Sequence, residues 1–259
     1  MTQAMIKTAH RPSWIDLSSN DASGSRAFYS RLFDWKVDVN PDPQYGGYGR
    51  ATVHGRDAAG ITPTQSKDQP TAWNFYIHTD DADETARAVE AAGGKVAMKP
   101  FDVGDQGRMA VFEDPAGAFI SVWQPTKMGG FQAEGSNTFG WAELNAEGID
   151  KAIPFYQKVF GWTTKRSPVP GGPDYTEFQL DGTSVGGATE MDPAAAAKMP
   201  SHWLVYFDVD DIPATFKKAI GLGAKELVAP QSYPGGEFAI LADPQGAAFG
   251  LFKSTSAQR

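Results

Sequence analysis

Short runs of alternating apolar and polar residues predict strands, and longer runs with apolar residues three to four apart predict helices. Residues 14–17 and 73–78 are short, mostly apolar runs, which predict strands. Residues 21–33 have the helical pattern, with Phe28 and Leu32 on one face. The first part of the chain is therefore predicted to alternate strands with helices.

Turn and capping residues divide these elements. A hairpin at 48–62 is predicted to turn at His54–Gly55, and a second one at 107–124 to turn at Asp114–Gly117. Asp21 is placed to cap the first helix, and Asp80–Asp81 to cap a second one. A strand, a helix and a hairpin thus occur twice in succession, which predicts two βαβββ units.

The second half of the chain repeats the first. Trp14–Leu17 returns as Trp141–Leu144, Ala27–Tyr29 as Pro154–Tyr156, Leu32–Trp35 as Val159–Trp162, Trp73–Tyr76 as Trp203–Tyr206, and Asp114–Gly117 as Asp243–Gly246. The offset is 127 residues at the first segment (141 − 14) and 129 at the last (243 − 114). Such a long and nearly constant offset indicates a duplicated domain rather than a short-period solenoid.

The repeat predicts the domain organisation. We expect modules at 12–125 and 137–253, a linker at 126–136, and tails at 1–11 and 254–259. Modules of roughly 120 residues are large enough for a hydrophobic core each.

Composition removes several classes of function. The chain has no cysteine, which excludes disulfides, thiol nucleophiles and cysteine-bound metals. Its 31 acidic and 23 basic residues give a net charge of −8, which disfavours nucleic acid and anionic membrane surfaces. No apolar run approaches the ~18 residues of a membrane span. We therefore expect a cytoplasmic protein.

Several motifs together resemble a known superfamily. They are Phe-Tyr followed by Leu-Phe-x-Trp or Val-Phe-Gly-Trp, a strand that leads into Asp-Asp and a helix, and a closing Asp-Pro-x-Gly hairpin. The combination resembles the vicinal oxygen chelate superfamily, which includes glyoxalase I, bleomycin-resistance proteins and extradiol dioxygenases. More narrowly, the paired Trp-x-Asp/Glu-Leu strands and the Gly-Arg-Met-Ala-Val-Phe-x-Asp-Pro stretch resemble a tandem glyoxalase-like actinobacterial family that includes a mycobacterial culture-filtrate antigen.

The resemblance implies a fold. It implies an α+β fold of two tandem glyoxalase-like modules, in which paired βαβββ units form a curled mixed sheet around a cleft. Single-module relatives obtain a second module by dimerising, so the fused chain favours a monomer over a homodimer.

The superfamily usually binds a divalent metal from the first strand, the strand before the second helix and the last strand. Counting along the motifs assigns these positions to Trp14, Asn74 and Ser121 in the first half, and to Trp141, Leu204 and Gly250 in the second. Indole, leucine and glycine side chains offer no ligand atom, and Asn and Ser are weak neutral ligands. We therefore expect no metal cofactor. A site made from His202, Asp16 and Glu143 is the alternative.

The first strand of each module carries a carboxylate. Alternation places Asp16 on the same face as Trp14, and Glu143 on the same face as Trp141, and the resemblance puts this face in the cleft. Desolvation beside an indole would raise a carboxyl pKa, so Asp16 or Glu143 is a candidate general base, with a tyrosine or His202 as the candidate acid. The alternative is that both carboxylates accept structural hydrogen bonds that hold the modules in register.

Aromatic and polar side chains on the same strands are candidates for binding a flat ligand. The predicted ligand-binding residues are Trp14, Trp141, Asn74, Tyr76, Tyr206, Ser121, Trp123 and Arg108. The alternative for the aromatic members is core packing, which we expect for the helix residues Phe28, Phe33, Phe155 and Phe160. Arg108 is either a contact for an anionic group or a surface charge.

Three functions are compatible with these residues. The first is binding of a small, partly aromatic or oxygenated metabolite in an aromatic-lined cleft, without the usual metal. The second is a metal-independent lyase or isomerase that uses Asp16 or Glu143 as general base. The third, a metal-dependent glyoxalase or dioxygenase, conflicts with the residues at the six ligand positions. A small molecule is the expected partner in each case.

Overall fold

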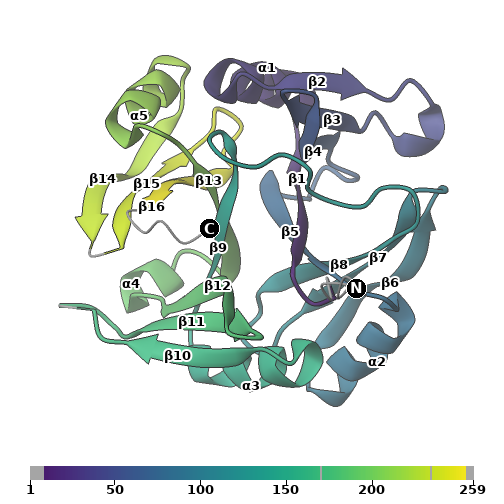
Figure 1. Ribbon diagram of the computed structural model, residues 1–259, viewed down its shortest axis with the longest axis vertical. Helices are drawn as coiled ribbons and strands as arrows, with labels where there is room; N and C mark the ends of the chain where they lie inside the picture. The colour runs from purple at the N-terminus through teal and green to yellow at the C-terminus, as the bar shows by residue number, and fades with distance from the viewer. Residues whose placement is uncertain (1–8, 170, 234, 255–259) are drawn as a thin grey trace, which may run out of the picture. The chain divides into compact units, whose positions relative to one another are not determined.

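The structure is a computed structural model that describes residues 9–169, 171–233 and 235–254 (Figure 1). Its strands are β1 Pro12–Ser19, β2 Lys36–Val39, β3 Gly49–Val53, β4 Arg56–Pro63, β5 Ala72–His78, β6 Lys95–Val103, β7 Gly107–Glu113, β8 Phe119–Pro125, β9 Thr138–Ala146, β10 Thr163–Ser167, β11 Tyr175–Leu180, β12 Thr183–Glu190, β13 His202–Asp208, β14 Lys225–Tyr233, β15 Gly236–Ala242 and β16 Ala248–Ser254. Its helices are α1 Ala22–Phe33, α2 Ala82–Ala91, α3 Ile149–Phe160, α4 Pro193–Ala196 and α5 Ile212–Gly221, with a 3-10 turn at Pro43–Tyr45. Most of the predicted tails at 1–11 and 254–259 lies outside the described residues.

The strands form two eight-stranded mixed sheets with the same order. The first sheet is β2-β3-β4-β1-β5-β8-β7-β6, and the second is β10-β11-β12-β9-β13-β16-β15-β14. The pairs β1–β4, β5–β8 and β13–β16 are parallel, whereas β3–β4 and β15–β16 are antiparallel hairpins. Each sheet uses the strands of one half of the sequence. The predicted α+β fold, with one mixed sheet in each half of the sequence, is confirmed.

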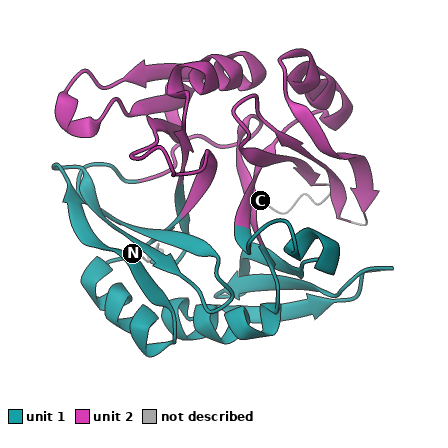
Figure 2. Cartoon of the chain, turned by 180° about the vertical axis from the view of Figure 1, so that it is seen from behind, with its two compact units in different colours: residues 1–14, 76–129, 145–202 teal, residues 15–75, 130–144, 203–259 magenta. Residues whose placement is uncertain are grey.

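Contacts between residues divide the chain into two compact units that cut across the two halves (Figure 2). Unit 1 contains residues 1–14, 76–129 and 145–202, and unit 2 contains residues 15–75, 130–144 and 203–259. Unit 1 thus includes α2 and α3, and unit 2 includes α1 and α5. Each unit combines one βαβββ segment from each half of the sequence.

The core of unit 2 is a cluster of aromatic rings. Phe33 of α1 lies 4.8 Å from Phe207 of β13, and Trp73 of β5 lies 5.1 Å from the same ring, between centroids. Tyr29 of α1 meets Phe249 of β16 edge to face at 5.6 Å. All five side chains are buried. Edge-to-face and tilted ring pairs of this kind add to the stability gained from burial alone.

Unit 1 has an equivalent core. Tyr156 of α3 stacks on Trp162 at 5.6 Å, and Trp162 lies 5.2 Å from Phe178 of β11. Phe155 and Phe160 are also buried. Together with Phe28 and Phe33 in unit 2, these residues confirm the prediction that the helix aromatics are core.

Most predicted capping residues act as expected. The side chains of Asp21, Asp81 and Asp211 accept hydrogen bonds from helix N–H groups at 2.8 to 2.9 Å. Helix α3 differs, because its N-cap is Gly148. The carboxylate of Glu190 accepts from the N–H groups of Gly148 and Ile149 at 2.7 and 2.8 Å instead. A side chain distant in sequence replaces the local cap.

Strands β2, β6, β10 and β14 were not predicted. They lie at or near the sheet edges, and most of their residues are exposed, so they lack a clean apolar alternation. His10 lies in the turn before β1. His10 is half-buried, and its ring meets Phe160 edge to face at 5.7 Å.

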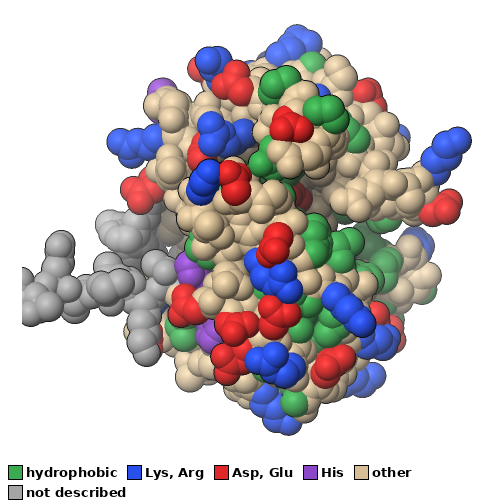
Figure 3. Space-filling model, turned by 90° about the vertical axis from the view of Figure 1, so that its right-hand side faces the viewer, with side chains coloured by type: hydrophobic (Ala, Val, Ile, Leu, Met, Phe, Trp, Pro, Cys, Tyr) green, Lys and Arg blue, Asp and Glu red, His purple; other side chains and the backbone are tan. Residues whose placement is uncertain are grey.

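The surface shows no separation of charge on the side seen in Figure 3, where acidic and basic side chains are mixed. None of the helices among the described residues is long and apolar enough to span a membrane.

Candidate functional site

The Phe-Tyr and Asp-Pro-x-Gly motifs, which lie far apart in the sequence, meet in each unit. In unit 2, the Tyr29 hydroxyl donates to Oδ2 of Asp243 at 3.1 Å and accepts from Nε1 of Trp73 at 3.0 Å. In unit 1, Tyr156 donates to Oδ2 of Asp114 at 2.8 Å. The other carboxylate oxygen of each aspartate accepts two backbone N–H groups of its own turn. These signature residues fasten a helix to a hairpin.

Burial raises the pKa of Asp114 and Asp243, and it raises the pKa of Tyr29 well above its usual value. The tyrosine hydroxyl and the turn amides oppose the shift of the carboxyl groups, because each stabilises the carboxylate. Both aspartates are buried, and both carboxylate oxygens of each accept hydrogen bonds within the fold.

The tryptophan of the Leu-Phe-x-Trp and Val-Phe-Gly-Trp motifs is also structural. Trp35 Nε1 donates to the carbonyl of Asn137 at 2.8 Å in unit 2, and Trp162 Nε1 donates to the carbonyl of His10 at 2.8 Å in unit 1. Asn137 and His10 both have left-handed backbone, with φ of 67° and 66°. The motifs that identified the fold are therefore explained by packing.

Asp16 lies inside a polar network in unit 2. It is 6% exposed, and its Oδ1 accepts from Nδ2 of Asn74 at 2.8 Å. The Tyr48 hydroxyl lies 3.5 Å from Oδ2, and Asn74 also donates to Ser18 Oγ at 3.0 Å. Gly60 makes room for Tyr48, since a Cβ there would lie 1.9 Å from the hydroxyl oxygen. This carboxylate is held by the fold.

Glu143 occupies the same position in the repeat as Asp16 (143 − 16 = 127) but has different surroundings. It is half-buried, and its Oε1 accepts from the Tyr206 hydroxyl at 3.2 Å. The Tyr206 ring lies flat over Gly250, where a Cβ would come within 1.9 Å of the ring. Glycine at 250 is therefore required for Tyr206 to reach Glu143.

Aromatic side chains surround Glu143 on one face of unit 2. Trp141 lies two residues before Glu143 on β9, and Phe252 lies two residues after Gly250 on β16, so each pair shares a strand face. Phe238 is directly opposite Phe252 in the β15–β16 register, so the two share a face. Tyr233 stacks on Phe252 with centroids 6.4 Å apart. We call these residues with Glu143 and Tyr206 the Glu143 face: Trp141, Glu143, Tyr206, Tyr233, Phe238 and Phe252.

The Glu143 face is the more exposed side of its strands, and its most buried member is Tyr206, which is 5% exposed. The alternate residues Ala239, Leu241, Phe249 and Leu251 are buried, and Phe249 packs against α1. On the Glu143 face, Trp141, Phe238 and Phe252 are half-buried, and Tyr233 is 40% exposed. Burial and the charge of Glu143 raise the pKa of Tyr233 to about 12. Its hydroxyl is therefore protonated at neutral pH.

Four predicted ligand-binding residues are buried in unit 1. Trp14, Tyr76, Ser121 and Trp123 are each 5% exposed or less. Ser121 is opposite Tyr76 in the β5–β8 register, and Trp123 Nε1 donates to the carbonyl of Met128 at 2.8 Å.

Arg108, also in unit 1, belongs to a surface ion cluster. It donates to Asp83 at 2.9 and 3.1 Å and to Asp102 at 2.9 Å. Hydrogen bonds to these two carboxylates raise the pKa of Arg108. Its guanidinium already has carboxylate partners.

His202 begins β13 and belongs to unit 1, whereas Asp16 and Glu143 belong to unit 2. Its Nδ1 donates to the carbonyl of Pro200 at 3.0 Å, and burial lowers its pKa, so the imidazole is neutral at neutral pH. Within the described part of the chain, no three His, Asp or Glu side chains form a group that could hold a metal.

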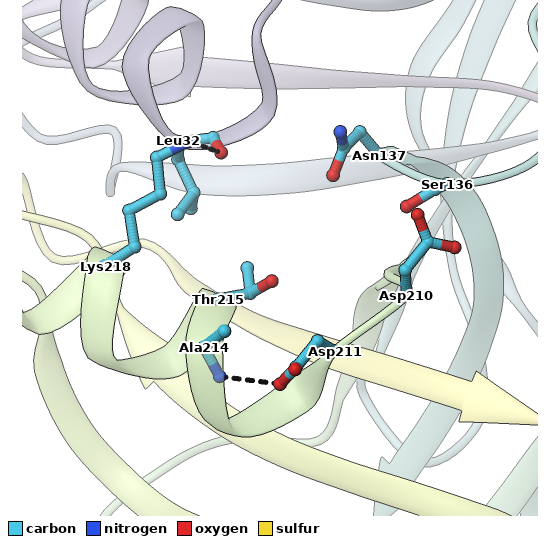
Figure 4. Close-up of a pocket in the computed structure, with 8 residues that line it drawn as sticks. All are labelled: Leu32, Ser136, Asn137, Asp210, Asp211, Ala214, Thr215 and Lys218. Atoms are coloured by element: carbon cyan, nitrogen blue, oxygen red, sulfur yellow. Dashed lines mark hydrogen bonds between the residues drawn. The ribbon is translucent and has the colours of Figure 1, made fainter.

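Sequence reasoning missed an open depression of about 250 Å³ in unit 2. It is lined by Leu32, Ser136, Asn137, Asp210, Asp211, Ala214, Thr215 and Lys218 (Figure 4). Asp211 caps α5 through the Ala214 N–H at 2.8 Å, and Lys218 Nζ donates to the Leu32 carbonyl at 2.8 Å. The pair Asp210–Asp211 was the one sequence signal for this depression, but an Asp-Asp pair before a helix predicts a helix cap.

The sequence also matches a known family. The family described as "Glyoxalase/Bleomycin resistance protein/Dioxygenase superfamily" matches residues 11–122 and 138–251. The chain belongs to this superfamily. Both modules are matched, as the resemblance of the motifs implied.

Two relatives match this chain over nearly its whole length. "Putative glyoxylase CFP32" of Mycobacterium bovis is 38% identical over 95% of this chain and 96% of its own. "Anthracycline biosynthesis protein DnrV" of Streptomyces peucetius is 37% identical over 93% of this chain and 92% of its own. The Mn(II)-bound glyoxalase from Novosphingobium aromaticivorans has the same fold, with a TM-score of 0.69 at 15% identity over 97% of this chain and 84% of that one.

The residues at the six expected ligand positions of this chain do not suit the divalent metal that the superfamily usually binds. The positions assigned by the motifs hold two indoles, Asn, Ser, Leu and Gly. Asn74 is already hydrogen-bonded to Asp16 and Ser18, and Tyr206 covers the space where a side chain at 250 would begin. Neutral amide and hydroxyl oxygens do not make a transition-metal site.

Proposed function

We propose that the protein binds a small, partly aromatic, oxygenated molecule on the Glu143 face, without the divalent metal of its superfamily. The observation that carries the proposal is the half-buried carboxylate of Glu143 among half-buried aromatic rings. Asp16, its counterpart in the repeat, is buried in a hydrogen-bond network and less accessible to a ligand.

The chemistry of the face suits such a ligand. Binding sites for small molecules combine apolar and aromatic walls with a few polar groups that fix orientation. Trp141, Phe238 and Phe252 supply apolar surface, and Glu143 supplies an acceptor at a defined position. The names of the two relatives, "Putative glyoxylase CFP32" and "Anthracycline biosynthesis protein DnrV", also refer to small molecules.

A lyase or isomerase activity is the second candidate, and one observation favours it. Glu143 has the Tyr206 hydroxyl at 3.2 Å, and its charge acts on the protonated Tyr233. A carboxylate next to tyrosine hydroxyls has the parts of a base that removes a proton and an acid that returns one. Glu143 suits this role better than Asp16, because a substrate must reach the base directly.

The first test is elemental analysis and native mass spectrometry of the purified protein. We expect less than about 0.1 mole of transition metal per chain, and any retained organic molecule would identify the ligand class. A stoichiometric metal whose removal abolishes binding would overturn the metal-free proposal.

The second test is calorimetric titration with 2-naphthol, a planar hydroxylated ring, in the presence and absence of EDTA. We expect binding that EDTA does not change and that Trp141→Ala weakens at least about tenfold. Phe119→Ala is the control, since Phe119 is 57% exposed and lies in unit 1. Equal affinity in both variants would place binding elsewhere. Turnover of a substrate that Glu143→Gln abolishes would favour the enzyme over the binding protein.

A further inference from the structure

We propose that the depression of unit 2 is a further binding site, for a small protonated amine that carries a neighbouring hydroxyl group. The depression has a volume of about 250 Å³ and shares no residue with the Glu143 face. The proposal is carried by a comparison with the equivalent place in unit 1, where the same polar groups are bonded within the fold. It is also carried by the charges of the side chains that line the depression.

The repeat gives the depression a counterpart in unit 1. Three of its residues have these counterparts: Asp80 for Asp210, Thr85 for Thr215 and His10 for Asn137 (210 − 80 = 130, 215 − 85 = 130 and 137 − 10 = 127). The backbone supports the alignment, because Asn137 and His10 both have left-handed φ and both accept a tryptophan Nε1–H at their carbonyl. The two places therefore share a framework and can be compared residue by residue.

In unit 1, the polar groups of this place have partners within the fold. Oδ1 of Asp80 lies 3.3 Å from Nε2 of His78. The hydroxyl oxygens of Thr85 and Thr79 are 2.7 Å apart, and Thr85 also donates to the carbonyl of Asp81 at 2.8 Å. The carboxylate and the hydroxyl are thus both used by the fold of unit 1.

In unit 2, both partners are replaced: the sequence has Asp208 and Val209 where unit 1 has His78 and Thr79 (208 − 78 = 130). A carboxylate cannot donate a hydrogen bond to another carboxylate, and valine offers no hydroxyl to a threonine. Among the residues that the structure describes, the carboxylate of Asp210 and the hydroxyl of Thr215 have no hydrogen-bond or ion-pair partner. Both groups are therefore available to a ligand.

The available groups line one space. Figure 4 shows Asp210 at one side of the depression and Lys218 at the other, with Asn137 and Thr215 between them. Leu32 adds an apolar wall. A small ring or chain can lie against this wall while its polar substituents meet the carboxylate, the amide and the hydroxyl.

The charges favour a cation beside Asp210. The lining includes two carboxylates, Asp210 and Asp211, and one ammonium group, Lys218. Asp211 is engaged as the cap of α5, and Nζ of Lys218 donates to the Leu32 carbonyl at 2.8 Å rather than to either aspartate. Asp210 is therefore the carboxylate that an ammonium group would meet, through a charge-assisted hydrogen bond. The neighbouring amide and hydroxyl can each accept from and donate to a ligand hydroxyl.

The test is an NMR titration of the isotope-labelled protein at pH 7 with 2-aminocyclohexanol, cyclohexylamine and cyclohexane-1,2-diol. The first has an ammonium group and a hydroxyl, the second has only the ammonium group, and the third has only hydroxyls. We expect 2-aminocyclohexanol to shift the backbone amides of Ser136, Asn137 and Thr215 in a saturable manner. It should bind at least about fivefold more tightly than the diol, as one charge-assisted hydrogen bond would give, and at least about twofold more tightly than cyclohexylamine.

Asp210→Asn keeps the shape of the side chain and removes its charge, so the preference over the diol should fall below about twofold. Asp80→Asn is the matched control, because it makes the same change at the equivalent position of unit 1. It should leave the preference unchanged, and thermal melting should show that both variants are folded. If 2-aminocyclohexanol binds no more tightly than the diol, if its shifts lie outside the depression, or if Asp210→Asn keeps the preference, the inference is overturned.

Discussion

Asp16 and Glu143 occupy equivalent positions in the two halves of the chain, yet their burial and hydrogen-bond partners differ. Asp16 is 6% exposed and bound to Asn74, with Tyr48 at 3.5 Å, whereas Glu143 is half-buried beside Tyr206. The strands differ in the same way. From Ser13 to Ser19 every residue of β1 is buried, whereas β9 alternates buried and half-buried residues from Trp141 to Ala146. One copy of the acid is therefore buried in the fold, and the other is more exposed.

The largest expected effect comes from removing Asp16. Asp16→Ala removes a buried carboxylate and leaves the half-buried Asn74 amide with Ser18 Oγ as its remaining acceptor, and we expect a loss of about 2 to 4 kcal/mol in the free energy of unfolding. Glu143→Ala should cost no more than about 1 kcal/mol, because water can replace the carboxylate at a half-buried site. Urea unfolding of the two variants measures the difference. Equal losses would remove the contrast between the two acids.

Tyrosine hydroxyls should show the next largest contrast. Tyr29→Phe leaves Asp243 Oδ2 and the Trp73 N–H without a shared partner in the core, which should cost about 2 to 3 kcal/mol. Tyr206→Phe should cost about 1 kcal/mol or less but weaken 2-naphthol binding, since it frees the orientation of Glu143. Denaturation and calorimetry on the same samples separate the two roles. A Tyr206→Phe variant that loses stability and keeps affinity would assign Tyr206 to the fold.

Glycines beneath the tyrosines give a third comparison. Gly250→Ala places a Cβ 1.9 Å from the Tyr206 ring, so the ring must move. We expect a loss of about 1 to 2 kcal/mol and about tenfold weaker binding of 2-naphthol. Gly60→Ala displaces Tyr48 in the same manner and should lower stability alone. Weaker binding in Gly60→Ala than in Gly250→Ala would point to the Asp16 side as the ligand site.

The smallest effect is expected from pH. Burial raises the pKa of Asp114 and Asp243, so the folded state holds their protons more tightly than the unfolded chain does. Their contribution to stability is therefore greatest below the unfolded pKa of about 3.9 and declines as the pH rises through the folded values. Asp114→Asn/Asp243→Asn should have a shallower decline of unfolding free energy than the wild type above pH 4, measured by urea titration at each pH. A steeper decline in the variant would contradict the direction of these shifts.

The fold was predictable because the features that define it are local or repeated. Turn pairs such as His54–Gly55 and caps such as Asp81 act within a few residues, and the offset between the halves aligned every motif. Edge strands such as β6 and β14 were not predicted, because exposed strands show little alternation of apolar and polar residues. The cap of α3 by Glu190 was not predicted, because Glu190 lies about forty positions from the start of the helix.

The candidate site was predictable in its residue types but not in its arrangement. Alternation placed Asp16 on one face with Trp14 and Glu143 on one face with Trp141, but it could not tell that Asp16 would be buried and Glu143 half-buried. Phe238, Phe252 and Tyr233 were not predicted as part of the face. Their place depends on the pairing of β14, β15 and β16, which is a property of the sheet rather than of any one segment.

The most direct measurement of the central claim is an NMR titration of the protein with ring-labelled tyrosine, using 2-naphthol as the probe. The Glu143 face contains Tyr206 and Tyr233, whereas Tyr48 and Tyr29 lie beside Asp16 and Asp243. We predict that the Tyr206 and Tyr233 resonances shift in a saturable manner and that the Tyr48 and Tyr29 resonances stay in place. A shift confined to Tyr48 would show that ligands bind beside Asp16, and would contradict the assignment of function to Glu143.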